Sequence, residues 1–313
     1  MHWLLHQILL NMNRASFASV NYQSLQQLIV HSSRTKNVSS IPSFIYVLSK
    51  MFHGESKLDS NKFLKDENLC HSGSNDYKRN KTLKLPKSEE ELKNVAQLAA
   101  SKIAIGKIIA VPTDTIYGIA CLVQNESAVQ DLYNIKGRHP DKPVSVCVAE
   151  IDDIYRWGEV TVSRELLEKL LPGPVTLCFS RKKELNTEFN PESELVGIRI
   201  PDHFFVRELC RRLQSFEGCC SPIALTSANV SGSDSCLETK EFAETLFSRP
   251  NSKLEMIFDG GRLGETRLSR LGSTIVDLST KGYYKIIRQG SAESQTVKIL
   301  KSHDLLEYSS IKT

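Results

Sequence analysis

The alternation of helical and extended patterns between residues 88 and 292 constrains the fold of this chain most. Residues 88–107 read SEEELKNVAQLAASKIAIGK: Ser88 and Glu91 form a capping box, apolar residues follow at helical spacing, and Gly106 ends the pattern. The adjoining KIIAVP, residues 107–112, is typical of a buried strand. Helices and strands alternate in the first half of this region, and strands cluster at its end. The pattern therefore predicts an α/β domain, built in layers around a mixed, twisted sheet.

The remaining elements follow from the same two periodicities. Further helices are predicted at 126–137, 163–171, 203–214 and 239–247. Further strands are predicted at 144–149, 175–180, 196–201, 222–227, 256–261, 273–279 and 283–290. Residues 55–87 are polar and aperiodic, which indicates a linker, and residues 293–313 are expected to form a loosely attached tail.

The first 54 residues differ in composition from the rest of the chain. They contain Arg14, Arg34, Lys36 and Lys50, and the first acid is Glu55. A basic, acid-free, Ser-rich start with a short amphipathic stretch is typical of a mitochondrial transit peptide. The alternative is an unstructured leader with no address. We expect a transit-like leader over 1–54, and protein in both mitochondria and cytoplasm. No apolar run approaches the roughly 20 residues of a membrane span, so no stable membrane insertion is expected.

The cysteines and histidines give no pattern of a metal site. None of the eight cysteines forms a C-x-x-C pair, and most stand in apolar runs. The eight histidines do not cluster at metal-ligand spacing. Buried free thiols in a reducing compartment are the expected state, and a zinc site is not expected.

Four polar clusters fall at predicted strand ends, where open α/β sheets place their ligands. The first is Thr113–Thr115, the second is Lys136 with Arg138, the third is LTSANVSG at 225–232, and the fourth is Ser273, Thr274 and Arg288. Lysine offers a point charge and arginine a planar fork, and both bind phosphate oxygens. Each cluster alone could be a solvated turn or a cap. Together they supply cations and small hydroxyl and amide donors.

The catalytic motifs that are absent narrow the chemistry. The sequence contains no G-x-x-x-x-G-K-[ST] loop, no G-x-G-x-x-G fingerprint and no G-x-S-x-G elbow. A site of anion-binding donors fits phosphoryl or nucleotidyl transfer, which depends on positioning and charge. A module that binds RNA without catalysis is the alternative, although a net charge of +4 without one long basic block is weak support for nucleic acid.

Seven motifs together resemble one known family. VPTDTIYGIA, KGRHPDKPVSV, LPGPVTL, VGIRIPDH, ALTSANVSG, LGSTIVDLS and IIRQG occur in the order and spacing of the YrdC family of threonylcarbamoyl-AMP synthases. The resemblance covers about 88–292, which would be the catalytic domain. It implies a three-layer fold with a concave active-site cavity. It also implies the reaction of L-threonine, bicarbonate and ATP to threonylcarbamoyl-AMP, pyrophosphate and water, the first step of a tRNA modification.

The resemblance assigns roles to particular residues. The family's catalytic tetrad falls on Lys136, Arg138, Ser227 and Asn229. Threonine binding is implied for Thr113, Arg199, Ser227 and Ser273, and ATP binding for Lys136, Arg138, Pro140, Asn229 and Arg288. Leu195 and Leu225 depart from the family pattern, which makes any contact at these positions one of the main chain.

The remaining expectations concern cofactor and partners. Mg²⁺ should enter with ATP, held through its phosphates and not by protein ligands. The product would pass to a tRNA threonylcarbamoyl transferase, and weak contact with tRNA would accompany this step. A relative that uses ATP on another carbamoyl substrate is a third interpretation. Lys136 and Arg138 are expected to line the cavity, so that their removal would affect activity and hardly affect stability.

Overall fold

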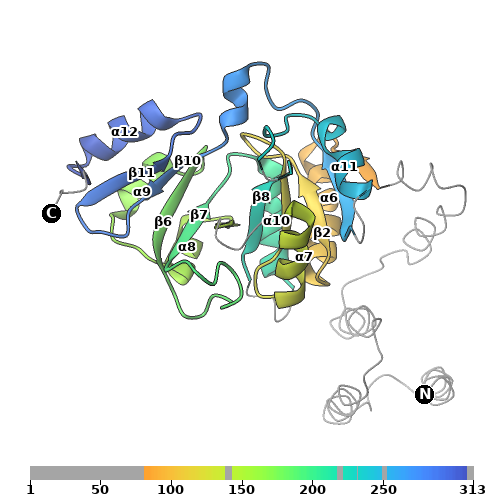
Figure 1. Cartoon of the computed structure of the whole chain (residues 1–313), viewed down its shortest axis with the longest axis horizontal. Helices are drawn as coiled ribbons and strands as arrows, with labels where there is room; N and C mark the ends of the chain where they lie inside the picture. The colour runs from red at the N-terminus through yellow and green to blue at the C-terminus, as the bar shows by residue number, and fades with distance from the viewer. Residues whose placement is uncertain (1–80, 138–142, 217–220, 231, 249–251, 309–313) are drawn as a thin grey trace, which may run out of the picture. The chain divides into compact units, whose positions relative to one another are not determined.

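The computed structural model describes residues 81–137, 143–216, 221–230, 232–248 and 252–308. These residues form a twisted sheet with strand order β1-β9-β2-β3-β8-β4-β7-β6-β10-β11-β12, and β5 pairs with β6 beside this path (Figure 1). The sheet contains both parallel and antiparallel pairs: β2 is antiparallel to β3, for example, and β4 is parallel to β7. The mixed, twisted α/β architecture predicted from the sequence is therefore confirmed.

The first half of the domain follows the predicted pattern closely. Helix α6 (Glu89–Ala104) begins at Ser88, whose side chain accepts from the Glu91 amide, and the chain leaves it through Gly106 at φ +79°. Strands β2 (Ile108–Val111) and β3 (Gly118–Leu122) form a hairpin. Helix α7 (Glu126–Lys136) ends at Gly137, which adopts the left-handed conformation at φ 56°. That turn places Lys136 at the very end of its helix.

The second half supplies the rest of the sheet. Its helices are α8 (Ile151–Trp157), α9 (Arg164–Leu170), α10 (Phe204–Gln214), α11 (Ala243–Ser248) and α12 (Glu293–Ser302). Its strands are β4 (Ser145–Cys147), β5 (Gly158–Glu159), β6 (Val175–Arg181), β7 (Leu195–Arg199), β8 (Ile223–Ser227), β9 (Leu254–Asp259), β10 (Thr274–Asp277), β11 (Tyr283–Arg288) and β12 (Leu306–Glu307). Two short 3₁₀ helices, η2 (Thr239–Glu241) and η3 (Arg267–Leu271), complete the described elements.

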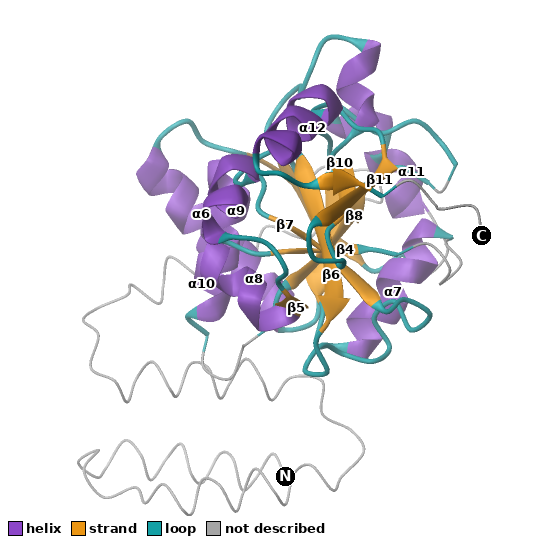
Figure 2. Ribbon diagram, turned by 90° about the vertical axis from the view of Figure 1, so that its left-hand side faces the viewer, coloured by secondary structure: helices purple, strands orange, loops and turns teal. Residues whose placement is uncertain are grey.

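One face of the sheet is covered by helices over only part of its width. Helices α6 and α10 pack on that face against Ala120 of β3, Cys147 of β4 and Leu225 of β8, whereas α7 lies on the opposite side (Figure 2). Side chains that pair across neighbouring strands point to the same face. Cys147 pairs with Arg199 of β7, so Arg199 continues the face that α6 and α10 cover.

The same face is uncovered by these two helices beyond β4. Among the described residues, the α6–α10 cluster includes no residue of β7, β6 or β10. On this face Gly197 and Ile275 are half-buried, whereas Arg199, Thr176, Cys178 and Ser273 are buried. We call this part of the face, formed by Gly197, Arg199, Thr176, Cys178 and Ser273, the open half. Its polar and small side chains stand where the covered half has apolar ones.

Three segments differ from the sequence-based expectation. Thr82–Lys84 forms strand β1 and pairs with β9, so regular structure begins within the segment predicted as linker. The tail predicted to be loosely attached forms α12, where Leu300 is fully buried, and β12, which pairs with β11. The helix predicted at 239–247 is divided into η2 and α11, because Phe242 leaves helical geometry and packs into the core.

The thiols agree with the prediction where the structure describes them. Cys121, Cys147, Cys178, Cys210 and Cys236 are free and buried. No described helix is long and apolar enough to cross a membrane. The predicted leader, residues 1–54, lies outside the described residues and stays a prediction.

Candidate active site

The ammonium group of Lys136 joins two of the sequence-predicted clusters. Its Nζ donates to the Ser227 carbonyl at 2.6 Å, to Ser227 Oγ at 3.2 Å and to Asn229 Oδ1 at 3.4 Å, and it also contacts the Asn229 carbonyl oxygen. Helix α7 delivers the lysine from one side, and the end of β8 delivers the oxygens from the other. Three members of the predicted tetrad, which are 91 and 93 residues apart in sequence, therefore meet at one point.

The burial of Lys136 corrects one expectation. The residue is only 2% exposed, and its ammonium lies among carbonyl and side-chain oxygens. A lysine in this position fixes the loop after β8 as well as carrying charge. Removing it would leave several buried acceptors unpaired, which is destabilising. In contrast to the sequence-based expectation, we therefore expect loss of Lys136 to lower stability.

Arg199 is held at the end of β7 by the loop that follows β2. Its Nη2 forms an ion pair with Asp114 and donates to Thr115 Oγ1 at 2.9 Å. The second carboxylate oxygen of Asp114 accepts from the Asp202 amide at 3.1 Å. The buried Nε of Arg199 has no hydrogen-bond partner among the described residues. Asp114 and Thr115 were noted in the sequence only as part of a polar cluster, because their partner stands 84 and 85 residues away.

The hydroxyl of Thr113 organises its own loop. Its Oγ1 accepts from the amides of Thr115 at 3.1 Å and Ile116 at 3.2 Å, and it donates to the Ile116 carbonyl at 2.7 Å. The side chain is buried. This turn sets the position of Thr115 under Arg199. A direct contact between Thr113 and threonine stays a prediction, and the proton of its hydroxyl is used within the loop.

Ser273 and Arg288 meet Thr176 at the far side of the open half. Ser273 Oγ lies 2.8 Å from Thr176 Oγ1 and accepts from Arg288 Nη2 at 3.1 Å. The same guanidinium group donates to the Ser273 carbonyl from Nη2 at 2.8 Å and from Nε at 3.2 Å. Two residues predicted from separate motifs, on β11 and just before β10, are thus brought together. Thr176 completes the contact and was not predicted, because VTLCFS gives no sign of which face its threonine takes.

The two positions that depart from the family pattern have different settings. Leu225 is buried and packs with the α6–α10 cluster, so its side chain belongs to the core. Leu195 is half-buried at the start of β7, where its amide donates to Ser193 Oγ at 3.2 Å. Arg138 and Pro140 lie outside the described residues, and their assigned roles stay predictions.

His203 lies beside this site at the start of α10. Its Nδ1 is buried and has no hydrogen-bond partner among the described residues. Burial lowers the pKa of the imidazole, while the nearby carboxylates of Asp114 and Asp202 act in the opposite direction. The imidazole is therefore biased toward its neutral form. A neutral His203 does not compete with Arg199 for the charge of Asp114.

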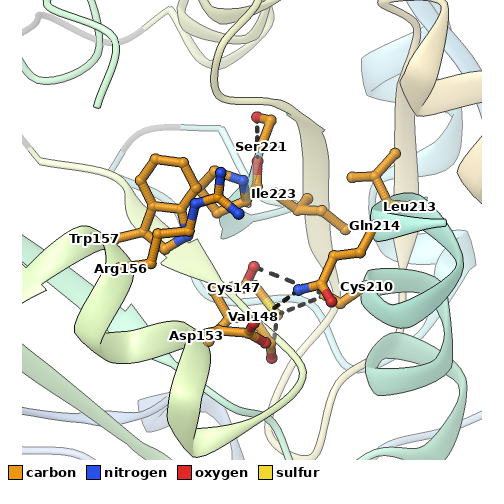
Figure 3. Close-up of a pocket in the computed structure, with 11 residues that line it drawn as sticks. Cys147, Val148, Asp153, Arg156, Trp157, Cys210, Leu213, Gln214, Ser221 and Ile223 are labelled. Atoms are coloured by element: carbon orange, nitrogen blue, oxygen red, sulfur yellow. Dashed lines mark hydrogen bonds between the residues drawn. The ribbon is translucent and has the colours of Figure 1, made fainter. Parts of the chain in front are cut away.

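A separate cavity of about 120 Å³ lies between β4, α8 and α10 (Figure 3). It is lined by Cys147, Asp153, Trp157, Cys210 and Gln214 among others. Gln214 Nε2 donates to Asp153 Oδ1 at 2.9 Å, and the Cys147 and Cys210 sulfur atoms are 3.7 Å apart. None of the residues that the sequence assigns to the site lines this cavity. We therefore place the candidate active site on the open half of the sheet.

Comparison with known proteins agrees with the mixed α/β fold. A sequence model of the Sua5/YciO/YrdC family, described as telomere recombination, matches residues 101–290. A mouse threonylcarbamoyl-AMP synthase is 46% identical over 204 residues, which cover 64% of this chain and 69% of that protein. A human threonylcarbamoyl-AMP synthase is 45% identical over the same length and coverage.

Solved structures extend the comparison to the fold. Sua5 from Pyrococcus abyssi, crystallised with L-threonine, is similar at a TM-score of 0.58 and 25% identity. The match covers 74% of this chain and 64% of the Sua5 chain, so this protein spans less than two thirds of that structure. The chain belongs to the Sua5/YciO/YrdC family, as the sequence motifs indicate.

Proposed function

We propose that this protein is a threonylcarbamoyl-AMP synthase, an enzyme that converts L-threonine, bicarbonate and ATP to threonylcarbamoyl-AMP, pyrophosphate and water. The observation that carries the proposal is the meeting of Lys136, Ser227 and Asn229 at one point. This constellation lies within the matched family region, in a chain whose mammalian relatives are named for this activity. Identity of about 45% over 204 residues supports carrying the activity to this chain.

The reaction needs two anions to be aligned. The amine of threonine attacks the carbon of bicarbonate to give a carbamate, with loss of water. A carbamate oxygen then attacks the α-phosphorus of ATP, and the bond to the β-phosphate oxygen breaks to release pyrophosphate. The carbamate and the triphosphate repel each other, so fixed positive donors on both lower the barrier.

The described residues offer one set of donors for each anion. Arg199 is fixed by Asp114 and Thr115, and its buried Nε remains available for a carboxylate oxygen of threonine. Lys136, with Ser227 and Asn229, would act on the phosphates, and Arg288 on the far wall would contact ATP. Ser273 would contact threonine. Arg138 and Pro140 are assigned to ATP by the sequence motif alone.

Mg²⁺ is proposed to enter with the phosphates of ATP. Asp114, the acid that the first cluster contributes, already accepts from Arg199 and from the Asp202 amide. When bound, the ion would neutralise charge on the triphosphate. Bicarbonate as co-substrate, transfer of the product to a tRNA threonylcarbamoyl transferase, a weak tRNA contact, and distribution between mitochondria and cytoplasm are part of the same proposal.

A non-catalytic RNA-binding role is supported less well. Binding of an RNA backbone requires exposed cations, whereas Lys136 and Arg199 are 2% and 6% exposed. Buried cations beside hydroxyl groups fit a small substrate that enters a cleft. The relatives are named as enzymes, which also disfavours the binding-module alternative.

The proposal is tested by mixing the full-length protein with ATP, Mg²⁺, threonine and bicarbonate. Pyrophosphate and a product of the mass of threonylcarbamoyl-AMP should form only when all are present. Equal pyrophosphate release without threonine would indicate simple ATP hydrolysis and would overturn the proposal. Product formation with a different carbamoyl acceptor in place of threonine would favour the third interpretation.

A further inference from the structure

Asp114 is an acid placed where the proposed substrates are anions. Its side chain is 8% exposed, and so is that of its partner Arg199. An isolated carboxylate at this position would repel the carboxylate of threonine and the phosphates of ATP. Its placement therefore needs a reason other than direct attraction of either anion.

The contacts of Asp114 supply that reason. One carboxylate oxygen accepts from Arg199 Nη2 and the other from the Asp202 amide, so the side chain connects the loop after β2 to the chain just beyond β7. Both links cross more than 80 residues of sequence. A carboxylate that accepts on both oxygens has its orientation fixed, and it fixes the guanidinium plane in turn.

The hydrogen bonds of Arg199 show which part of the guanidinium remains for substrate. Its hydrogen bonds within the described residues leave from Nη2, to Asp114 and Thr115. The buried Nε has none. A buried donor without a protein partner is expected to bond to a ligand or to water. Asp114 thus holds one nitrogen and leaves Nε for a ligand.

We infer that Asp114 is a positioning residue that sets the affinity for the amino-acid substrate by fixing Arg199. The inference rests on the proposed function, in which Arg199 takes the carboxylate of threonine. Asp114 does not touch the substrate in this account. Its loss should weaken threonine binding selectively, because the ATP donors on α7 and β8 do not depend on it.

The substitution Asp114→Asn tests this role. Asparagine presents one oxygen and one amide, so it cannot accept from both Arg199 and the Asp202 amide. We expect the KM for threonine to rise about tenfold or more, the loss of roughly one charge-assisted hydrogen bond. The KM for ATP should stay within about twofold of wild type. A role in stability alone would lower the melting temperature and shift both KM values together.

Asp152→Asn is the matched control. Asp152 also pairs with an arginine, Arg164, but the two side chains are 74% and 51% exposed. An exposed pair contributes little, so both KM values and the melting temperature should remain those of wild type. The control separates loss of any Asp–Arg pair from loss of the buried one.

Asp114→Glu keeps the test decisive should Asp114→Asn fail to fold. Glutamate retains the charge but moves the carboxylate by one methylene, so the KM for threonine should rise to an intermediate value, about threefold. Binding of threonine and of ATP, each measured alone by calorimetry, should show the same split. Unchanged threonine affinity in the folded variants, or an equal loss for both substrates, would overturn the positioning role while wild-type activity stands. Wild-type protein that neither binds threonine nor forms the adenylate would overturn the proposed function itself.

Discussion

The covered and open halves of one sheet face show how a single layer serves both stability and chemistry. Across β2, β3, β8 and β4, that face carries Val111, Ala120, Leu225 and Cys147 under α6 and α10. Across β7, β6 and β10, the same face carries Gly197, Arg199, Thr176 and Ser273. The strands are hydrogen-bonded to each other throughout. The two halves therefore differ in whether α6 and α10 cover them. Polar side chains occur on the part of the face that these helices do not cover.

The largest expected effect concerns the choice of amino acid by the open half. Threonine and valine have nearly the same shape and differ by one hydroxyl. The hydroxyl groups of Thr176 and Ser273 hydrogen-bond to each other, which leaves one hydroxyl proton of the pair for the substrate hydroxyl. Valine would leave that buried donor unpaired, so it should be rejected by roughly 10⁴-fold in kcat/KM. Serine, which lacks only a methyl, should be disfavoured by about 10- to 200-fold. Competition kinetics measure the order, and Ser273→Ala should narrow the gap between threonine and valine. If valine were used as readily as serine, the open half would select its substrate by shape alone.

The next effect concerns Lys136, at the end of α7. Lys136→Ala should lower kcat/KM by roughly 10²-fold or more, the scale of losing one charged contact to the transition state. It should also lower the free energy of unfolding by about 2–3 kcal/mol, because buried oxygens of Ser227 and Asn229 lose their donor. Steady-state kinetics and urea unfolding measure the two effects on one preparation. A loss of activity with unchanged stability would contradict the stabilising role and would show that Lys136 only lines the cavity as a charge.

Arg138→Ala should also lower kcat/KM by roughly 10²-fold. This residue lies outside the described part of the chain, so the prediction rests on the Lys-x-Arg motif alone. Steady-state kinetics with ATP varied at saturating threonine measure it. Near-normal turnover would remove Arg138 from the tetrad.

Two glycines allow the halves to be compared directly. A Cβ at Gly118, in the covered half, would lie 2.8 Å from Leu225 Cδ1 and 3.0 Å from the Thr226 carbonyl oxygen. A Cβ at Gly197, in the open half, would lie 3.0 Å from Thr176 Cγ2 and 3.5 Å from Cys178 Sγ. Gly118→Ala should cost about 1–3 kcal/mol of stability because backbone must shift. Gly197→Ala should cost less stability but about tenfold in kcat/KM, since the methyl enters the open half beside Thr176. A larger loss of stability in Gly197→Ala, with a larger loss of kcat/KM in Gly118→Ala, would contradict the division of the face into a covered and an open half.

The smallest effect is a dependence of stability on alkaline pH. Burial, with a smaller contribution from Asp277, raises the pKa of Cys178 to about 12. An unfolded thiol titrates near 8.5, so above that pH the unfolded chain binds fewer protons than the folded one and stability falls with rising pH. Wild type should therefore lose about 1 kcal/mol per pH unit more than Cys178→Ala between about pH 9 and pH 11. Urea unfolding at several pH values measures the difference. A constant difference between the two proteins would show that Cys178 titrates normally.

The sequence predicts local features well and long-range ones poorly. The capping box of Ser88 and Glu91 and the left-handed Gly137 are local signals. The start of α6 and the end of α7 accordingly fall where the sequence places them. The sequence predicts a linker where β1 forms, because that strand depends on pairing with the distant strand β9. It predicts a loose tail where α12 forms, because that helix depends on burial of Leu300 against the domain. Such partners are distant in the chain, and composition does not identify them.

The same limit applies to the candidate site. Family motifs bring Lys136, Ser227 and Asn229 together correctly, and Ser273 with Arg288. The burial of Lys136, the contact of Thr176 with Ser273 and the bridge from Asp114 to Arg199 depend on strand register. A shift of register by one residue would turn Thr176 or Arg199 to the opposite face, and no sequence pattern fixes it alone.

A crystal structure of the full-length protein with threonine and a non-hydrolysable ATP analogue tests the central claim most directly. The account predicts the threonine carboxylate on Arg199, above the open half between β7 and β10. It also predicts the phosphates near the Lys136 end of α7 and the loop after β8. Ligands bound instead in the cavity lined by Cys147 and Cys210, or on the face covered by α6 and α10, would contradict the placement of the active site.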